Sequence, residues 1–161
     1  MIPKKNYCRQ IRWTALLLVL VLAGCAATVR AKAGQTVSTA LFDFTVSEAR
    51  PLTEYPGVTV PEDRKLISLA MTVTNTGTGT LPVFAGDFQF QWGEGESDFG
   101  SCLDALDDQM MPYARDLAPG ESGGGLMLVL VPRDCERMQV VYQEQHADGT
   151  PAGTYFVEVP L

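Results

Sequence analysis

The sequence is poor in histidine and, after its first 24 residues, poor in basic side chains. A single His among 161 residues excludes metal sites built from several imidazoles, including the blue-copper set of two His and one Cys. Four of the 12 Lys and Arg residues fall within residues 1–24, which leaves eight cations against 19 acids in residues 25–161. Binding to a nucleic-acid backbone requires clustered Lys and Arg, so we expect no nucleic-acid partner.

Long hydrophobic runs are absent except for one near the N-terminus. Residues 14–23 are apolar and uncharged, but a helix that spans a bilayer needs about 20 such residues. The run follows four cations and ends in Leu22-Ala23-Gly24-Cys25, which resembles the lipobox of bacterial lipoproteins. We therefore interpret residues 1–24 as a signal peptide and Cys25 as the lipidated N-terminus of the mature protein. The alternatives are ordinary secretion with a spare cysteine and an uncleaved anchor.

Lipid at Cys25 would hold the protein on the extracytoplasmic face of a bacterial cell membrane. A processed lipoprotein carries at least two acyl chains, and two or more give stable anchoring. Residues 26–38 are rich in Ala, Thr, Gly and Ser and show no apolar periodicity, so we predict a flexible tether over residues 25–38. The remaining residues, 39–161, have the length of one ordinary domain.

No Cys-x-x-Cys motif is present, so we expect no thiol redox role. Cys8 lies in the predicted signal peptide and Cys25 is the predicted lipidation site, which leaves Cys102 and Cys135. An even pair of cysteines in an exported domain predicts a disulfide, because that compartment permits oxidation. Two buried free thiols are the alternative.

Helical periodicity is also missing from the body of the chain, where the dominant period is two. Apolar and polar residues alternate over residues 42–46 and 67–74, which is typical of half-buried strands. Turn signals such as Asp148-Gly149 separate the predicted strands. About seven strands at this spacing predict an all-β fold, an immunoglobulin-like, two-sheet antiparallel sandwich. The other predicted strands lie around residues 81–92, 110–117, 126–131, 138–145 and 154–159.

Five segments of this predicted sandwich follow one another in the order Phe44-Thr-Val-Ser-Glu-Ala49, Leu66-Ile-Ser-Leu-Ala-Met-Thr-Val-Thr-Asn-Thr-Gly77, Asp87-Phe88, Leu117-Ala-Pro-Gly-Glu-Ser122 and Gly125-Leu-Met-Leu-Val-Leu-Val-Pro132. In this order they resemble a family of bacterial exported proteins and lipoproteins with an immunoglobulin-like domain of unassigned function. The body is also similar to the immunoprotective extracellular antigen family. The resemblance implies an extracytoplasmic β-sandwich and offers no catalytic residues. This chain departs from the family in its acidic segment 94–108 and in its Cys102/Cys135 pair.

Acidic residues concentrate where basic ones are missing, since no Lys or Arg occurs between Lys65 and Arg115. The spacing of Glu94, Glu96 and Asp98 resembles the start of a calcium loop, although the later Gly and closing Glu are absent. A solvated acidic face and a docking patch for a basic partner are the other interpretations. The candidate partner or calcium residues are Glu94, Glu96, Asp98, Asp104, Asp107 and Asp108.

Residues 120–124 match the G-x-S-x-G pattern of a nucleophile elbow, with Ser122 as the nucleophile. That elbow needs a strand-to-helix turn in an α/β sheet, whereas this segment follows a Pro-Gly turn and precedes a predicted strand. Asp134 and His146 follow Ser122 in the order of a triad, but the expected fold gives them no such context. We therefore expect no enzymatic activity.

The sequence thus predicts a membrane-anchored, non-enzymatic interaction or accessory module, with membrane lipid at Cys25 and an envelope protein as its partner. The alternative is a small-ligand or calcium-binding surface protein, with calcium as its cofactor. Phe88, Phe90 and Trp92 alternate along one predicted strand. They are candidates for a ligand platform, although aromatics in this pattern are more typical of a core.

Overall fold

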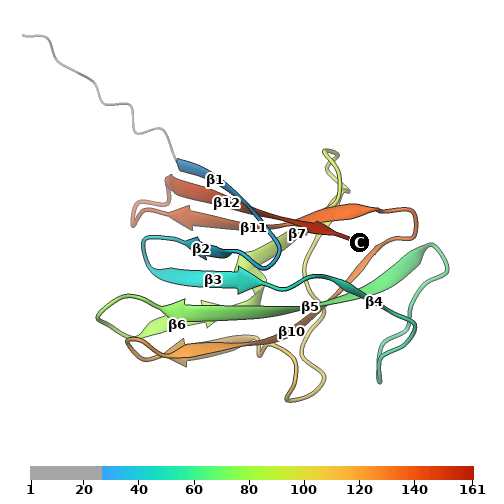
Figure 1. Cartoon of the computed structure of the whole chain (residues 1–161), viewed down its shortest axis with the longest axis horizontal. Helices are drawn as coiled ribbons and strands as arrows, with labels where there is room; N and C mark the ends of the chain where they lie inside the picture. The colour runs from blue at the N-terminus through green and yellow to red at the C-terminus, as the bar shows by residue number, and fades with distance from the viewer. Residues whose placement is uncertain (1–26) are drawn as a thin grey trace, which may run out of the picture.

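The computed structural model describes residues 27–161, which form an all-β sandwich of two main sheets (Figure 1). The first sheet has the strand order β1-β12-β11-β7-β8. The second has the order β10-β5-β3-β2, with β4 paired to β5, and a separate ribbon pairs β6 with β9. The strands are β1 (Ala27–Lys32), β2 (Thr36–Ser38), β3 (Phe42–Val46), β4 (Arg50–Leu52), β5 (Arg64–Asn75), β6 (Leu81–Phe84), β7 (Phe88–Gln91), β8 (Phe99–Gly100), β9 (Ala114–Leu117), β10 (Ser122–Pro132), β11 (Arg137–Gln145) and β12 (Pro151–Pro160).

The strand order is that of an immunoglobulin-like sandwich. β5 and β10 are neighbours in one sheet, β7, β11 and β12 are neighbours in the other, and the chain crosses between the sheets after β5 and after β10. In the immunoglobulin fold, the places of β5 and β10 are taken by strands B and E, and those of β7, β11 and β12 by strands C, F and G. The predicted all-β sandwich is therefore confirmed. It contains twelve strands rather than about seven, because two- to four-residue strands such as β2, β4 and β8 are too short to show a period.

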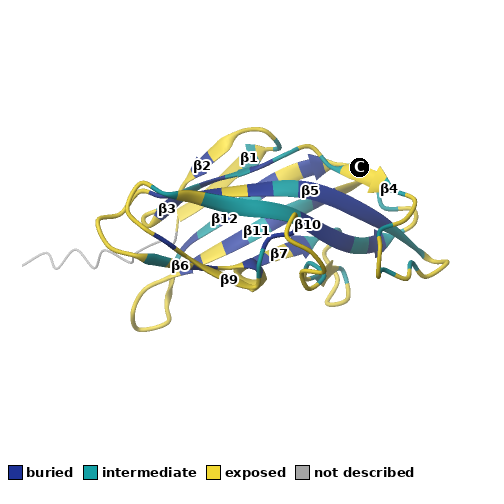
Figure 2. Ribbon diagram, turned by 90° about the horizontal axis from the view of Figure 1, so that it is seen from below, coloured by how far each residue is buried: buried dark blue, intermediate teal, exposed yellow. Residues whose placement is uncertain are grey.

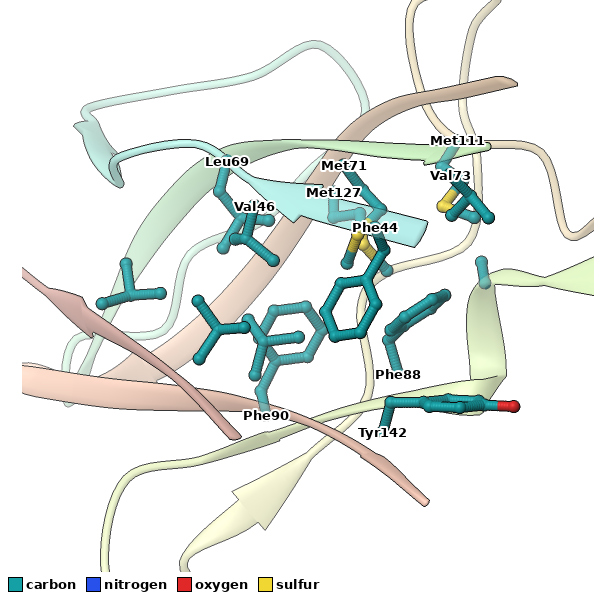
Figure 3. Packing of buried hydrophobic residues seen from close by; sticks show 14 of the residues in the cluster. Phe44, Val46, Leu69, Met71, Val73, Phe88, Phe90, Met111, Met127 and Tyr142 are labelled. Carbon is teal, nitrogen blue, oxygen red and sulfur yellow. The ribbon is translucent and has the colours of Figure 1, made fainter. Parts of the chain in front are cut away.

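The core lies between the two sheets, where alternate residues of each strand point inward (Figure 2). Aromatic rings from both sheets meet at its centre, and Phe44 packs on Phe88 with ring centroids 5.5 Å apart (Figure 3). Each such side chain contributes roughly 1.5–3 kcal/mol when removed from water. Phe88 and Phe90 are fully buried and belong to this core, as their alternation suggested, whereas Trp92 is only half-buried.

The predicted flexible tether over residues 25–38 is wrong for residues 27–38, which form β1, a turn and β2. β1 runs parallel to β12, from Ala27 beside Gly153 to Lys32 beside Glu158. Its residues are mostly exposed because the strand is held by its backbone ladder along the open edge of β12. A strand held in this way leaves no hydrophobic pattern in the sequence. Cys25 therefore precedes β1 by only two positions in the sequence, although residues 1–26, which include Cys25, lie outside the described residues.

The segment 101–111 runs along the free edge of β10. The Met111 N–H donates to the Leu126 carbonyl (2.8 Å), and the Leu103 N–H donates to the Leu128 carbonyl (2.7 Å). This pairing covers an edge that would otherwise expose unpaired backbone groups. The approach is close enough that a Cβ on Gly125 would lie 2.5 Å from the Met111 nitrogen. The predicted strand over residues 110–117 is therefore shorter than expected, because β9 begins only at Ala114.

Turns gather at two opposite ends of the sandwich (Figure 1). We name the first the Ala27 end. It carries Ala27 and the turns 39–41, 76–80, 118–121 and 146–150, which are linked by hydrogen bonds from the Ala40 N–H to Glu144 Oε1 (3.2 Å) and from the Gly120 N–H to the Asn75 carbonyl (2.9 Å). β11 and β12 form a hairpin that runs between this end and the opposite one.

We name the opposite end the Trp92 end, and it consists of loops 61–63, 92–98 and 133–136. The Arg133 N–H donates to the Asp63 carbonyl (3.0 Å), and the Arg64 guanidinium lies 5.8 Å from the centroid of the Trp92 ring. These contacts bring together loops that are far apart in the sequence. Among residues 27–161, no helix is both long enough and apolar enough to cross a membrane.

Candidate ligand and partner site

A hollow of about 520 Å³ lies on the outer face of the first sheet, beside the Trp92 end. It is built on β1, β7, β11 and β12, whose alternation turns one set of side chains into the core and the other set outward. The outward set is polar and includes few apolar residues. The side chains that give the hollow its chemistry are Arg30, Gln91, Trp92, Glu94, Arg137, Gln139, Phe156 and Glu158.

Strand register places the amide side chains of this hollow in one row. Gln139 on β11 lies opposite Gln91 on β7 and opposite Glu158 on β12, and Glu158 lies opposite Lys32 on β1. Directly opposed residues of one face have Cβ atoms about 5 Å apart. The row therefore presents two neighbouring amides, then an acid and then a base, which suits a polar ligand or a polar protein surface.

Two arginines border the hollow without a carboxylate partner. The Arg30 guanidinium lies 4.8 Å from the centroid of the Phe156 ring, which is a cation–π arrangement. The ion pairs among the described residues are Arg64–Asp63 and Arg115–Glu121, so neither Arg30 nor Arg137 is engaged in one. A guanidinium that is positioned but not paired can bind a carboxylate or phosphate through two parallel hydrogen bonds.

Loop 92–98 gives the first three predicted acids different roles. Asp98 turns back over its own loop, where its Oδ2 accepts the Gly95 N–H (2.9 Å) and its carbonyl accepts the Trp92 N–H (2.8 Å). Glu94 and Glu96 are exposed, and Glu94 also lines the hollow. Asp98 therefore shapes the loop, and the two glutamates are the acids that it presents to solvent.

The Trp92 end gathers four acids that are not among the six predicted partner or calcium residues. Loops 61–63 and 133–136 contribute Glu62, Asp63, Asp134 and Glu136 beside loop 92–98. The antiparallel pairing of β5 with β10 brings Arg64 opposite Pro132, so the start of one strand and the end of the other share one end of the sheet. The sequence signal was the charged turn at each strand boundary, but only the pairing shows that the turns are neighbours.

Asp104, Asp107 and Asp108 lie apart from this end, in the segment along the edge of β10. Asp107 accepts a hydrogen bond from the Tyr55 hydroxyl (2.7 Å) and from the Gln109 N–H (3.0 Å). The Tyr55 hydrogen bond holds the pKa of Asp107 below its ordinary value, and the same bond raises the pKa of Tyr55. The six predicted carboxylates thus form two separate groups rather than one patch.

No group of three or more His, Cys, Asp or Glu side chains within residues 27–161 is placed to hold a metal ion. The i, i+2, i+4 spacing of Glu94, Glu96 and Asp98 does not converge on one point, since Asp98 caps its own loop. The geometry therefore gives the calcium interpretation no ligand set in the described part of the chain.

Cys102 and Cys135 are free thiols, so the predicted disulfide is not formed. Cys102 stands next to Leu103 in the segment along β10, whereas Cys135 lies in the β10–β11 turn, where its Sγ donates to the Arg137 carbonyl (3.0 Å). An even count and an oxidising compartment do not determine where the fold places two cysteines. Burial raises the pKa of the Cys102 thiol, which lowers its reactivity near neutral pH.

The residues of the G-x-S-x-G pattern and its triad order are not assembled. Ser122 begins β10 at the Ala27 end, where its hydroxyl shares a hydrogen bond with Thr74 (2.8 Å). His146 lies in the β11–β12 turn at that end, and Asp134 lies at the Trp92 end. Glycine occurs at Gly120 and Gly124 for a structural reason instead, since both residues have positive φ angles.

A buried carboxylate near the Ala27 end was missed by the sequence analysis. Glu144 is only 6% exposed, and its Oε2 accepts the Tyr155 hydroxyl (3.0 Å) while its Oε1 accepts the Ala40 N–H. Burial, and then the nearby charge of Glu144, raises the pKa of Tyr142 to about 12. Glu144 links the first sheet to a turn of the second, so its role is structural. The alternation of β11 would have placed it on the inner face.

No protein-family model matches the sequence, and no similar sequence is found among curated proteins. Solved structures share the fold at low identity. The candidate lipoprotein ycdA of Bacillus subtilis matches 78% of this chain with a TM-score of 0.63 and 16% identity, and the match spans only 38% of ycdA. The yjhA protein of Bacillus subtilis matches 80% of this chain and 99% of its own length, with a TM-score of 0.60 and 16% identity.

A protein of unknown function from Listeria monocytogenes matches 81% of this chain and 83% of its own length, with a TM-score of 0.52 and 13% identity. At these identities the similarity shows the fold alone. The neighbours therefore include a candidate lipoprotein, and no match links the chain to the immunoprotective extracellular antigen family.

Proposed function

We propose that the protein is a membrane-anchored, extracytoplasmic lipoprotein whose sandwich acts as a non-enzymatic interaction module through its Trp92 end. The observation that carries the proposal is the direction of β1, which begins two positions after Cys25 and runs from the Ala27 end toward the Trp92 end. A lipid at Cys25 would thus be attached to the end of the sandwich opposite the hollow and the acidic loops. The fold shared with a candidate lipoprotein is consistent with this arrangement.

Strand length supports a display function. Five residue steps from Ala27 to Lys32 advance the chain by about 17 Å at roughly 3.3 Å per step. The β12 strand continues beyond Lys32 to Pro160 at the Trp92 end. Because β1 is paired along β12 from Ala27 onward, Ala27 belongs to the folded sandwich, and a lipid at Cys25 would leave the Trp92 end directed away from the membrane surface.

The chemistry of the Trp92 end favours a basic surface on an envelope protein. Its three loops contain seven acids against a single base, Arg133, and the flanking Arg64 pairs with one of these acids, Asp63 (3.8 Å). Clustered charge of one sign steers an oppositely charged partner and accelerates association, with strong dependence on salt. Five of these acids, Glu62, Glu94, Glu96, Asp134 and Glu136, are exposed and make no side-chain hydrogen bond within the described residues. Glu94 and Glu96 are the pair chosen for the test, because they share loop 92–98 and Glu94 also lines the hollow.

The first test is a crosslinking and pull-down experiment with the tagged, lipidated chain in cells, read by mass spectrometry. We expect one stoichiometric envelope partner that is lost in the double variant Glu94→Gln/Glu96→Gln. The matched control is Asp104→Asn/Asp108→Asn, which removes the same charge from two exposed acids along the β10 edge. Loss of the partner in the control, or retention in the Trp92-end variant, would contradict the proposed surface.

A small-ligand function is the second candidate, and the unpaired Arg30 and Arg137 beside the aromatic rings of the hollow favour it. Titration calorimetry of the lipidated protein in detergent with sodium phosphate tests this version. A saturable heat that disappears in Arg30→Gln/Arg137→Gln would move the function from partner binding to anion binding. Calcium chloride in the same assay tests the calcium alternative, whose heat would have to disappear in Glu94→Gln/Glu96→Gln.

A further inference from the structure

The Ala27 end carries little charge in its turns compared with the loops of the Trp92 end. Its four turns contain only two acids, Glu121 and Asp148, and one histidine, His146. Glu121 is neutralised by the Arg115 guanidinium at 3.0 Å. The other positions in these turns are mainly Thr, Gly, Ala and Pro. The Trp92 end, with seven acids in three loops, has the opposite character.

An apolar side chain stands at this uncharged end. Leu41 lies in the turn between β2 and β3 and is 48% exposed. The turn is well ordered, because the Thr39 hydroxyl oxygen accepts the N–H groups of Leu41 (3.1 Å) and Phe42 (3.0 Å). The same hydroxyl donates to the Phe42 carbonyl (2.9 Å). Leu41 is therefore held outward by a local hydrogen-bond pattern and does not fold back into the core.

The chain leaves almost no distance between the proposed lipid and this end. Two residue steps separate Cys25 from Ala27, and they span at most about 7 Å. A lipid inserted in the bilayer would thus draw the Ala27 end to the headgroup region. Polar but uncharged turns lose little hydration free energy on entering the headgroup region. An end with seven acids would lose much more and would also be repelled by anionic headgroups.

We propose that the Ala27 end rests on the lipid bilayer, with Leu41 at the boundary between headgroups and acyl chains and the Trp92 end directed away from the membrane. This orientation rests on the proposed lipid at Cys25. It adds a second membrane contact, made by the folded domain itself, and fixes which surface of the sandwich a partner can reach. Interfacial apolar side chains enter this boundary to a depth of roughly 5–10 Å.

The tryptophan content of the chain makes the orientation measurable. Trp92 is the only Trp after the predicted signal peptide, and it stands at the end expected to be distant from lipid. The lipidated protein is reconstituted in vesicles with bromine on the acyl chains, which quenches nearby Trp fluorescence. We expect no quenching of native Trp92. In Leu41→Trp/Trp92→Phe, we expect emission to fall to about half or less, as for a side chain at the interfacial depth.

Leu106→Trp/Trp92→Phe is the matched control, because Leu106 is 49% exposed but lies on the side of the sandwich, near Gly57. We expect its emission to be unchanged by bromine. If Trp92→Phe weakens folding, Leu41→Trp with Trp92 retained gives the same answer by difference. A lipidated Leu41→Trp variant without quenching, or quenching of equal size at all three positions, overturns the orientation alone. A mature protein whose mass shows no lipid overturns the anchor, and the orientation with it.

Discussion

Gly124 offers the sharpest test of how the β10 backbone is packed. It pairs with Thr72 on β5 and has a φ angle of 155°. A Cβ at this position would lie 1.9 Å from the Met71 carbonyl oxygen and 2.9 Å from the carbonyl carbon. Both atoms belong to the backbone of the neighbouring strand, so no side-chain rotation can relieve the overlap. Gly124→Ala must therefore push β10 away from β5.

The cost can be assembled from three contributions. An alanine at positive φ costs about 1–2 kcal/mol, and overpacking of a close contact costs about 1–3 kcal/mol. Weakening one ladder hydrogen bond adds about 1 kcal/mol. We expect Gly124→Ala to lower the free energy of unfolding by about 3–6 kcal/mol, a large part of the roughly 5–15 kcal/mol of a typical domain.

Equilibrium unfolding in urea, followed by circular dichroism, measures this loss. With a slope of about 2 kcal/mol per molar urea, the midpoint should fall by about 1.5–3 M. Gly79→Ala is the control, because a Cβ there meets nothing within 4 Å and Gly79 has no positive φ. Its stability should change by less than about 0.5 kcal/mol. Equal midpoints for the two variants would refute the close approach of β10 to β5 and reopen a functional reading of the glycine pattern.

Three further predictions concern polar groups. Glu144→Ala leaves the Tyr155 hydroxyl and the Ala40 N–H without their buried acceptor, so the free energy of unfolding should fall by about 2–3 kcal/mol in urea titrations. In Tyr55→Phe, the pKa of Asp107 should rise toward its ordinary value in an NMR titration of the carboxyl carbon, because the Tyr55 hydrogen bond is the main cause of the depression. Without reductant, the unfolded lipidated protein should titrate two thiols with Ellman's reagent, and Cys102 should react slowly before unfolding at neutral pH.

For each of these three predictions, one result would contradict it. An unfolding free energy of Glu144→Ala equal to that of the unsubstituted protein would show that the two hydrogen bonds accepted by Glu144 do not stabilise the fold. The lowered pKa of Asp107 adds stability above its ordinary value of 3.8, which is lost as pH falls through the folded-state pKa. As the pH falls, Tyr55→Phe should therefore lose less stability through protonation of Asp107 than the unsubstituted protein does. The same dependence of stability on pH in the acid range for both proteins would contradict the role of the hydrogen bond. Absence of free thiol without reductant would restore the disulfide.

The period-two pattern predicted most of the long strands because it is local. Residues 42–46 and 67–74 alternate since one side of each strand is buried, and this alternation needs no knowledge of the partner strand. Phe88 and Phe90 could be assigned to the core for the same reason. The Asp148-Gly149 turn was readable because Gly149 adopts a positive φ that few other residues tolerate.

What the sequence by itself determined was the class of fold, the two faces of each long strand and the position of the candidate lipid site. The tertiary structure alone decided that residues 27–32 complete a sheet, that Cys102 and Cys135 stay apart, and that the six predicted acids divide between two surfaces. These are outcomes of strand pairing between distant segments. Pairing of this kind is carried by backbone hydrogen bonds, which every residue except proline can make, and so it leaves no mark on the sequence.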